Sequence, residues 1–140
     1  MNKYMMIAYK EAKKANKKNE IPVGAVIVKN GKIISKAYNK KNKTNRVIDH
    51  AEILAITKAN KKLKNWRLDN CEIYITLEPC PMCASAIEQA RISKIYTSAS
   101  NNNEKNSNIS NSILNNINWT KDVDSKNSTS IIKNFFKNKR

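Results

Sequence analysis

The sequence predicts an α/β protein, a three-layer α/β/α sandwich in which a mixed sheet of about five strands carries helices on both faces. Two observations lead to this prediction: a pair of strand-like segments around an Asn-Gly step, and the alternation of strand-like and helix-like segments that follows it. With 140 residues, the chain has the size of one ordinary domain. We therefore expect residues 1–140 to form a single domain.

The first part of the chain predicts a helix followed by a hairpin. Over residues 3–18 the apolar side chains recur at a helical period, with lysines between them. Residues 23–29 and 32–38 are apolar segments of strand length on either side of Asn30-Gly31, the strongest short signal for a hairpin. We expect these two strands to be antiparallel neighbours.

The middle of the chain predicts a loop and then three further elements. The polar stretch 39–48 is typical of a loop, and Asp49 is a candidate N-cap for a helix over 50–62. Residues 72–77 alternate and are rich in β-branched side chains, which favours a strand. A helix is expected over 81–90, opened by proline.

The last part of the chain predicts a strand, a polar loop and two helices. Residues 92–99 have the composition of a strand, and the Asn/Ser-rich stretch 100–112 predicts a loop that passes into a short helix over 113–117. Residues 128–140 begin with hydroxyl side chains and then place apolar residues on one face of a final helix. Those apolar residues are Ile131, Ile132, Phe135 and Phe136.

The net charge is strongly positive, because 27 Lys and Arg face 11 Asp and Glu, a formal charge of +16. Such a charge attracts polyanions, so a nucleic acid is the natural partner. Lys, Asn and Ile are also abundant throughout the chain, as an A+T-rich genome would encode them, so the charge alone gives this partner only modest support.

The longest apolar runs are far shorter than the roughly 18 to 20 residues of a membrane span, and no export signal is visible. We expect a soluble, cytoplasmic protein.

The three cysteines favour metal binding or catalysis over a disulfide framework, since their number is odd and no export signal accompanies them. Cys80 and Cys83 form a Cys-x-x-Cys pair directly before and within a predicted helix. Cys71 fits no motif, and we interpret it as a small, partly buried apolar residue.

His50, Glu52, Cys80 and Cys83 bring an imidazole, an acid and two thiols to two predicted helix N-termini. The partial positive charge of a helix N-terminus lowers the pKa of a thiol and favours the thiolate that zinc requires. The two cysteines and His50 would supply three protein ligands to one zinc ion and leave a fourth position open for water, as in catalytic zinc sites.

Glu52 is better placed beside that water than on the metal, because it lies two residues beyond His50 on another side of the helix turn. It could take the proton from the water and deliver it to the substrate. A fourth protein ligand, Cys71 or a carboxylate, would instead close a structural site. A lone Cys-x-x-Cys is often a redox pair or half of a zinc knuckle, but the combination of His-x-Glu with Pro-Cys-x-x-Cys resembles the signature of zinc-dependent nucleobase deaminases.

Several longer stretches resemble the bacterial tRNA-specific adenosine deaminase family, within the cytidine and deoxycytidylate deaminase-like zinc superfamily. The stretches are 20–28, Asn39, 50–55, 76–84 and the basic end 134–140. The resemblance implies a cytidine deaminase-like fold, one zinc per chain, and hydrolysis of the wobble adenosine of a tRNA anticodon stem-loop to inosine. Zinc-bound hydroxide would attack C6 and ammonia would leave.

The resemblance also implies roles for residues around the metal. Asn39 would hydrogen-bond the flipped adenine, Pro22 and Val23 would form a wall of the pocket, and the peptide groups around Glu78 would lie near the metal water. A homodimer is implied as well, since both subunits of the family frame the RNA site.

One segment departs from the family. Residues 96–105 contain no glycine, and by rough register Asn101 stands where the family has an Asp in a loop expected beside the substrate strand. Two alternatives therefore stay open: a small-molecule guanine or cytosine deaminase, and an RNA-binding subunit that kept the fold and metal without catalysis. Glu52 argues against the second, because an inactive relative has no need of a proton shuttle.

Overall fold

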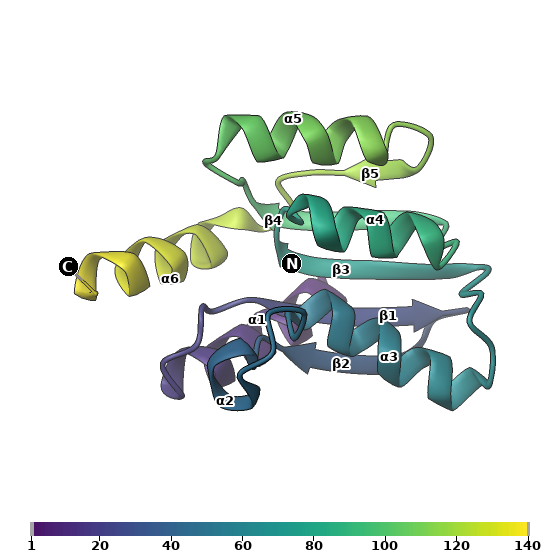
Figure 1. Ribbon diagram of the computed structural model, residues 1–140, viewed down its shortest axis with the longest axis horizontal. Coiled ribbons are helices and arrows are strands. Elements are labelled where there is room, and N and C mark those ends of the chain that lie inside the picture. The colour runs from purple at the N-terminus through teal and green to yellow at the C-terminus, as the bar shows by residue number, and fades with distance from the viewer. Residues whose placement is uncertain (1, 140) are drawn as a thin grey trace.

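A computed structural model of the protein describes residues 2–139, in which helices and strands alternate along most of the chain (Figure 1). The elements in chain order are α1 (Lys3–Lys17), β1 (Gly24–Lys29), β2 (Lys32–Tyr38), α2 (Lys41–Thr44), α3 (Ala51–Leu63), β3 (Cys71–Leu77), α4 (Pro81–Gln89), β4 (Lys94–Ala99), α5 (Glu104–Ile113), β5 (Asn118–Thr120) and α6 (Ser125–Asn138). Apart from the loop around 100–117, the predicted helices and strands begin and end within three residues of the observed ones. The final residue of the last predicted helix, Arg140, lies outside the described part of the chain.

The sheet is mixed and has the strand order β2-β1-β3-β4-β5. The hairpin strands β1 and β2 are antiparallel, and Asn30 and Gly31 between them both have positive φ angles, of 50° and 76°. Such angles suit the Asn-Gly turn of a two-residue hairpin. β3 pairs antiparallel with β1 and parallel with β4, and β4 pairs parallel with β5. The predicted mixed sheet is thereby confirmed.

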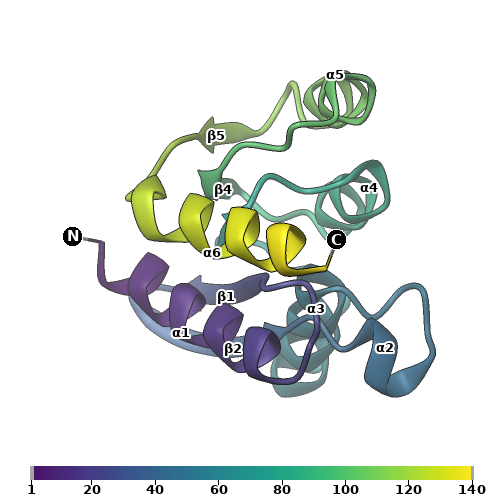
Figure 2. The same ribbon diagram turned by 90° about the vertical axis from the view of Figure 1, so that its left-hand side faces the viewer.

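Helices cover both faces of the sheet. α1 and α6 lie side by side on one face, while α3, α4 and α5 lie on the other (Figure 2). Successive side chains of β1 point to opposite faces of the sheet, and almost all of them are buried, so β1 is covered on both faces. Ala25 and Ile27 join the core beneath α3 and α4, whereas Val26 and Val28 pack with residues of α1. At Gly24 the approach of α1 is so close that a Cβ atom would collide with the Ala8 carbonyl oxygen.

The loop expected over 39–48 contains the short helix α2, which the sequence did not predict. Asp49 is not the N-cap of α3, as expected; that position belongs to His50. The Asp49 carboxylate is buried and instead accepts a hydrogen bond from Arg46 Nε at 3.2 Å. The ion pair with Arg46 therefore holds the approach to α3, and the first turn of α3 begins one residue later.

The expectation for residues 100–117 was wrong. The Asn/Ser-rich stretch forms the helix α5, the predicted short helix over 113–117 is mostly a turn, and β5 follows. Asn103 starts α5, since its side chain accepts a hydrogen bond from the Asn106 amide at 3.0 Å. Leu114 and Ser110 are buried against the rest of the protein. Capping and packing thus outweigh the weak helix propensity of Asn and Ser.

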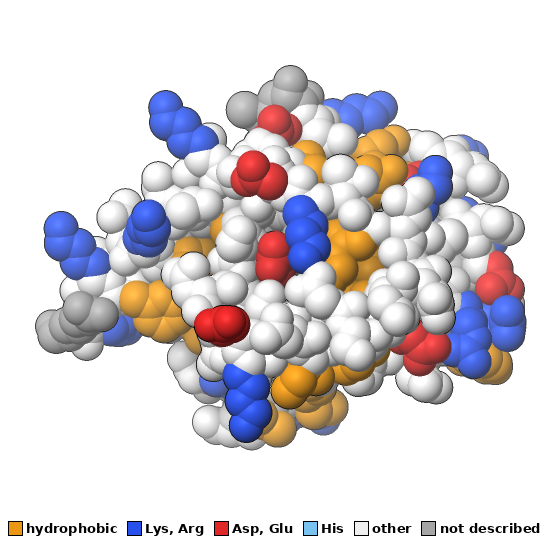
Figure 3. Space-filling model, turned by 90° about the horizontal axis from the view of Figure 1, so that it is seen from above, with side chains coloured by type: hydrophobic (Ala, Val, Ile, Leu, Met, Phe, Trp, Pro, Cys, Tyr) orange, Lys and Arg blue, Asp and Glu red, His pale blue; other side chains and the backbone are white. Residues whose placement is uncertain are grey.

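The charged side chains do not gather into one patch on the face above α5 and β5. Figure 3 shows Lys and Arg scattered there among uncharged side chains, with Asp and Glu between them. Within residues 2–139, none of the helices combines the length and apolar composition that crossing a bilayer requires.

Candidate active site

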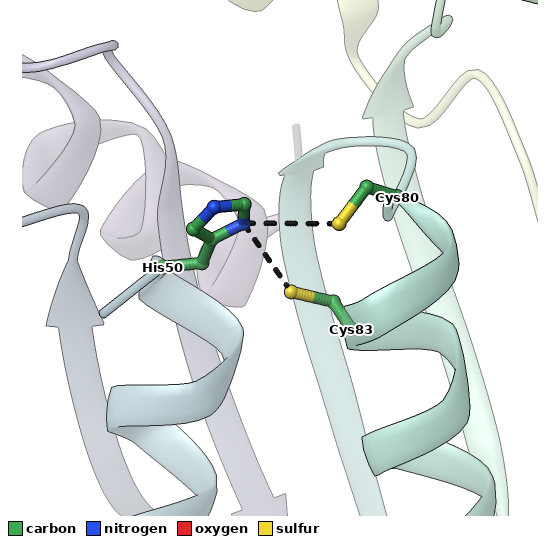
Figure 4. Close-up of side chains that lie close together, drawn as sticks. All are labelled: His50, Cys80 and Cys83. Atoms are coloured by element: carbon green, nitrogen blue, oxygen red, sulfur yellow. Dashed lines mark hydrogen bonds between the residues drawn. The ribbon is translucent and has the colours of Figure 1, made fainter. Parts of the chain in front are cut away.

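Two helix N-termini bring the predicted metal ligands together. His50 is the N-cap residue of α3, Cys80 is the N-cap residue of α4, and Cys83 lies in the first turn of α4. Pro81 follows Cys80 at the first helical position, where a missing N–H costs no hydrogen bond. Because α3 and α4 lie on the same face of the sheet, the three side chains point toward one another (Figure 4).

The donor atoms are close enough to share one ion. His50 Nδ1 lies 3.8 Å from Cys80 Sγ and 3.5 Å from Cys83 Sγ. The ligand atoms of the three residues all lie within 4.8 Å of one another. One imidazole and two thiols form a donor set suited to zinc. With three protein ligands the set leaves a coordination position free, which distinguishes a catalytic zinc site from a closed structural one.

The two thiols have opposite protonation preferences. The Cys83 thiol donates to the Cys80 sulfur, and this hydrogen bond, helped by His50, lowers the pKa of Cys80 to about 4. The same hydrogen bond, together with burial, raises the pKa of Cys83. The hydrogen bond with Cys80 in turn raises the pKa of His50. Cys80 is therefore a thiolate at neutral pH, which is the form that binds a metal.

Cys71 is not part of the centre. It is fully buried at the start of β3, and Cys80 follows the end of that strand. Leu77 lies six positions along the strand from Cys71, a distance of about 20 Å at the usual rise of a β-strand. In the described part of the chain, the group of side chains able to hold a metal consists of His50, Cys80 and Cys83.

Glu52 lies in the first turn of α3 and is only 4% exposed. Burial raises its pKa to about 7. Its side chain lines the cavity next to the metal ligands, but its carboxylate is not in the group of three metal-binding donors. A carboxyl group in this position can take and release a proton near neutral pH.

A cavity of about 140 Å³ opens beside the metal ligands. Its lining residues are Ile21, Val23, Asn39, Lys41, His50, Ala51, Glu52, Leu77, Glu78, Cys80 and Asn101. The volume is below the roughly 300 Å³ at which pockets for drug-sized ligands begin. A cavity of this size suits a single flat base better than a large cofactor. A wider groove of about 300 Å³ lies between α1 and α6, away from the three metal-binding residues.

Most of the predicted substrate-contacting residues lie at this cavity. Asn39, Val23 and Glu78 line it, whereas Pro22 is buried and its neighbour Ile21 lines the wall instead. Asn101, in the segment that departs from the family, lines the cavity too.

Four lining residues were not predicted: Ile21, Lys41, Ala51 and Leu77. Ile21, Ala51 and Leu77 lie inside stretches that resemble the family and could have been found there. Lys41 could not be singled out by sequence, because it lies in a lysine-rich loop. It reaches the cavity because α2 folds back on residues 19–20, where the Glu20 carboxylate accepts hydrogen bonds from the Asn42 and Lys43 amides.

The fold and the site define an α/β domain with three side chains that could hold a metal ion and a buried carboxyl group, Glu52, at the same cavity. Residues 1–99 match the cytidine and deoxycytidylate deaminase zinc-binding region. The chain belongs to this zinc-binding deaminase family.

Particular relatives are similar over different lengths. A tRNA-specific adenosine deaminase of Bacillus subtilis is 51% identical over 96 residues, which cover 69% of this chain and 60% of the relative. The chain therefore spans less than two thirds of the length of this curated relative. A structure from a study of A-to-I editing by tRNA:A34 deaminases at the wobble position of transfer RNA is 33% identical, with a TM-score of 0.85 over 91% of this chain and 97% of that one.

A guanine deaminase of Bacillus subtilis is also similar. Its X-ray structure is 39% identical, with a TM-score of 0.67 over 71% of this chain and 66% of that chain. The expected cytidine deaminase-like fold is confirmed by these structures together with the sheet order.

Proposed function

We propose that this chain is a zinc-dependent tRNA adenosine deaminase, which hydrolyses the wobble adenosine of an anticodon to inosine and releases ammonia. The observation that carries this proposal is the three-donor centre of His50, Cys80 and Cys83 with buried Glu52 at the same cavity. The likeness to a tRNA-specific adenosine deaminase and to a structure from work on tRNA:A34 deaminases supports the choice of substrate.

His50, Cys80 and Cys83 would hold the ion. When bound there, zinc would supply an acidified water at its open position as the nucleophile for hydrolysis. Glu52 would accept a proton from this water and pass it to a ring nitrogen of the base. Once the water oxygen is bonded to C6, the same residue would take the second proton from that hydroxyl group and give it to the amine, so that the C6–N bond breaks, a carbonyl forms and ammonia leaves.

The walls of the cavity would select and orient the base. We propose that Asn39 hydrogen-bonds the flipped adenine, that Pro22 and Val23 support the pocket wall, and that the peptide groups around Glu78 lie next to the reacting atoms. The Asn39 side chain is held in place for this role, because its Oδ1 accepts a hydrogen bond from the Lys41 amide at 3.1 Å. A flipped base must lose its stacking, which a closed pocket offsets by new contacts.

The partner would be the anticodon stem-loop of a tRNA, bound by a homodimer in the cytoplasm. The net charge of +16 supports a polyanionic partner. Lys41 at the cavity, with Lys40 and Lys43 next to it in sequence, would place positive charge where the flanking phosphates of the anticodon pass.

A direct test measures ammonia release from several substrates. Zinc-loaded protein would be incubated separately with adenosine, free guanine, free cytosine and an anticodon stem-loop that carries adenosine at the wobble position. The proposal predicts release from the stem-loop alone. Release from guanine instead would establish the second candidate, a guanine deaminase, which the 39% identity to the Bacillus subtilis enzyme favours.

A further inference from the structure

The turn between β3 and α4 is held by residues from outside the metal centre. This turn contains Glu78 and Pro79, directly before the ligand Cys80. The Glu78 amide donates to the Ala99 carbonyl at 2.9 Å, at the end of the neighbouring strand β4. From α5, the Ser110 hydroxyl donates to the Pro79 carbonyl at 2.9 Å. The segment after β4 therefore reaches back to the residue next to a metal ligand.

The Pro79 carbonyl depends on Ser110 because α4 offers it no partner. The first hydrogen bond inside α4 runs from the Ala84 amide to the carbonyl of Cys80, one residue later. Pro79 is buried and Ser110 is only 1% exposed, so water is not a ready substitute. A buried carbonyl that loses its partner carries a desolvation penalty.

Of the two thiol ligands, Cys80 is the one whose orientation depends more on the hydrogen bond between Ser110 and the Pro79 carbonyl. Cys83 lies within α4 and is fixed by the hydrogen bonds of the helix, whereas Cys80 is the N-cap residue with an extended backbone, at φ −69° and ψ 168°. The orientation of the peptide between Pro79 and Cys80 sets the direction in which the Cys80 side chain leaves the backbone. The carbonyl group of that peptide is the Pro79 carbonyl, which accepts the hydrogen bond from Ser110.

We infer that Ser110 is a positioning residue for the metal centre: through the Pro79 carbonyl it fixes the peptide that aims Cys80 at the ion. This inference rests on the proposed function in one respect, namely that the three donors hold zinc. It gives a physical reason for serine at this position of α5, within the stretch for which the sequence predicted only a loop.

The test compares zinc release from Ser110→Ala and from Ser112→Ala. Ser112 lies two positions further along α5 and is exposed, so it is a matched control. Each zinc-loaded protein would be mixed with an excess of a chromogenic chelator, and the rate of zinc transfer followed by absorbance. Groups that orient metal ligands typically contribute about 10- to 100-fold to metal affinity. We expect release from Ser110→Ala to be faster by a factor in this range, and release from Ser112→Ala to match the parent.

Spectroscopy distinguishes a role of Ser110 in positioning Cys80 from a role in general stability. Cobalt substituted for zinc gives thiolate charge-transfer bands, which should change in Ser110→Ala and not in Ser112→Ala. Ser110→Thr keeps the hydroxyl and should retain the parent bands and release rate, which covers the case in which Ser110→Ala does not fold.

Unchanged release and an unchanged cobalt spectrum in folded Ser110→Ala would overturn the inference, as would fast release from folded Ser110→Thr. Neither result would affect the proposed function. A parent protein that binds no zinc would overturn both, so the two failures are distinguishable.

Discussion

In the proposed function, three side chains at the centre hold the metal and a fourth, Glu52, moves protons. Cys80 and Cys83 differ in burial and in pKa, but both point at His50 Nδ1 and both are needed to complete three ligands. Glu52 lies in the same helix turn as His50 and is buried at the cavity instead of joining the ligands. That these four residues lie together could be predicted from the sequence, because the chemistry of such a centre restricts residue type and spacing.

The first prediction at this scale concerns the metal. Replacing Cys80 or Cys83 by Ser should remove zinc and lower stability, because two helix N-termini lose their shared ion. Cys71→Ser should keep one zinc per chain, since Cys71 is buried at the far end of β3. Metal content per chain, measured on the purified variants, decides the matter. Loss of zinc from Cys71→Ser would indicate a closed four-ligand site and contradict the enzymatic role.

A second prediction isolates the proton carrier. Glu52→Gln preserves the size and much of the hydrogen bonding of the side chain but cannot carry a proton. Zinc content and stem-loop affinity should stay near the parent values, while turnover falls by about 10⁴-fold or more, because one residue serves both the attack and the departure of ammonia. Single-turnover inosine formation measures the loss. A variant with normal zinc and RNA binding that still deaminates at near the parental rate would exclude this role.

At the scale of elements, the cavity is built where chain segments distant in sequence meet. Glu20 is 2% exposed, and its two carboxylate oxygens accept hydrogen bonds from the Asn42 and Lys43 amides at 3.0 and 2.8 Å. These bonds hold α2 against the chain entering β1 and so place Lys41 at the cavity.

A third prediction follows from this anchor. Glu20→Gln keeps one carbonyl acceptor and loses the other, so α2 should be held less firmly. The KM for the stem-loop should rise by roughly tenfold, equivalent to about 1.4 kcal/mol, with zinc content unchanged. Glu11→Gln is the matched control, since Glu11 is also buried but pairs with Lys14 on α1. Equal effects of the two substitutions on KM would show that the loss is one of general stability.

Elements with a strong local pattern could be predicted, and those that depend on tertiary contacts could not. The hairpin could be predicted because Asn30 and Gly31 suit the geometry of its turn, and α1 could be predicted because its apolar residues recur on one face. In contrast, α5 is made of residues that favour loops, and its helix relies on the Asn103 cap and on buried Ser110. α2 has four residues and no apolar face, so its lysines gave no signal of the contact with Glu20.

For the whole molecule, the question is whether the charge of +16 forms a working surface. On the face above α5 and β5 it does not, since lysines are scattered there (Figure 3). At the cavity side, Lys18, Lys40 and Lys43 surround Tyr38, which directly precedes the cavity residue Asn39. Lys18 Nζ donates to the Tyr38 hydroxyl at 2.9 Å, which lowers the pKa of Tyr38, and Lys40 Nζ lies 4.9 Å from the centre of the same ring.

The fourth prediction is that stem-loop affinity falls steeply with added salt. The lysines at or near the cavity are Lys18, Lys40, Lys41 and Lys43. If each of these four contacts one phosphate of a single strand, the slope of log affinity against log salt concentration should be about −3. Titrations at several ionic strengths measure this slope. Truncation before Lys137 should weaken binding as well, if the basic end of α6 belongs to the footprint. A slope near zero would mean that the charge has no part in recognition. Undiminished binding by the truncated protein would exclude the basic end of α6 from the RNA footprint.

The most direct measurement of the central claim is mass spectrometry of a transcribed tRNA with adenosine at the wobble position, before and after incubation with the zinc-loaded protein. Mass analysis of the nuclease fragments of the tRNA shows which nucleotide has changed. The proposed function predicts that the wobble adenosine alone becomes inosine, and that Glu52→Gln protein leaves it unchanged. A tRNA whose wobble adenosine survives incubation with folded, zinc-loaded protein would contradict the assignment.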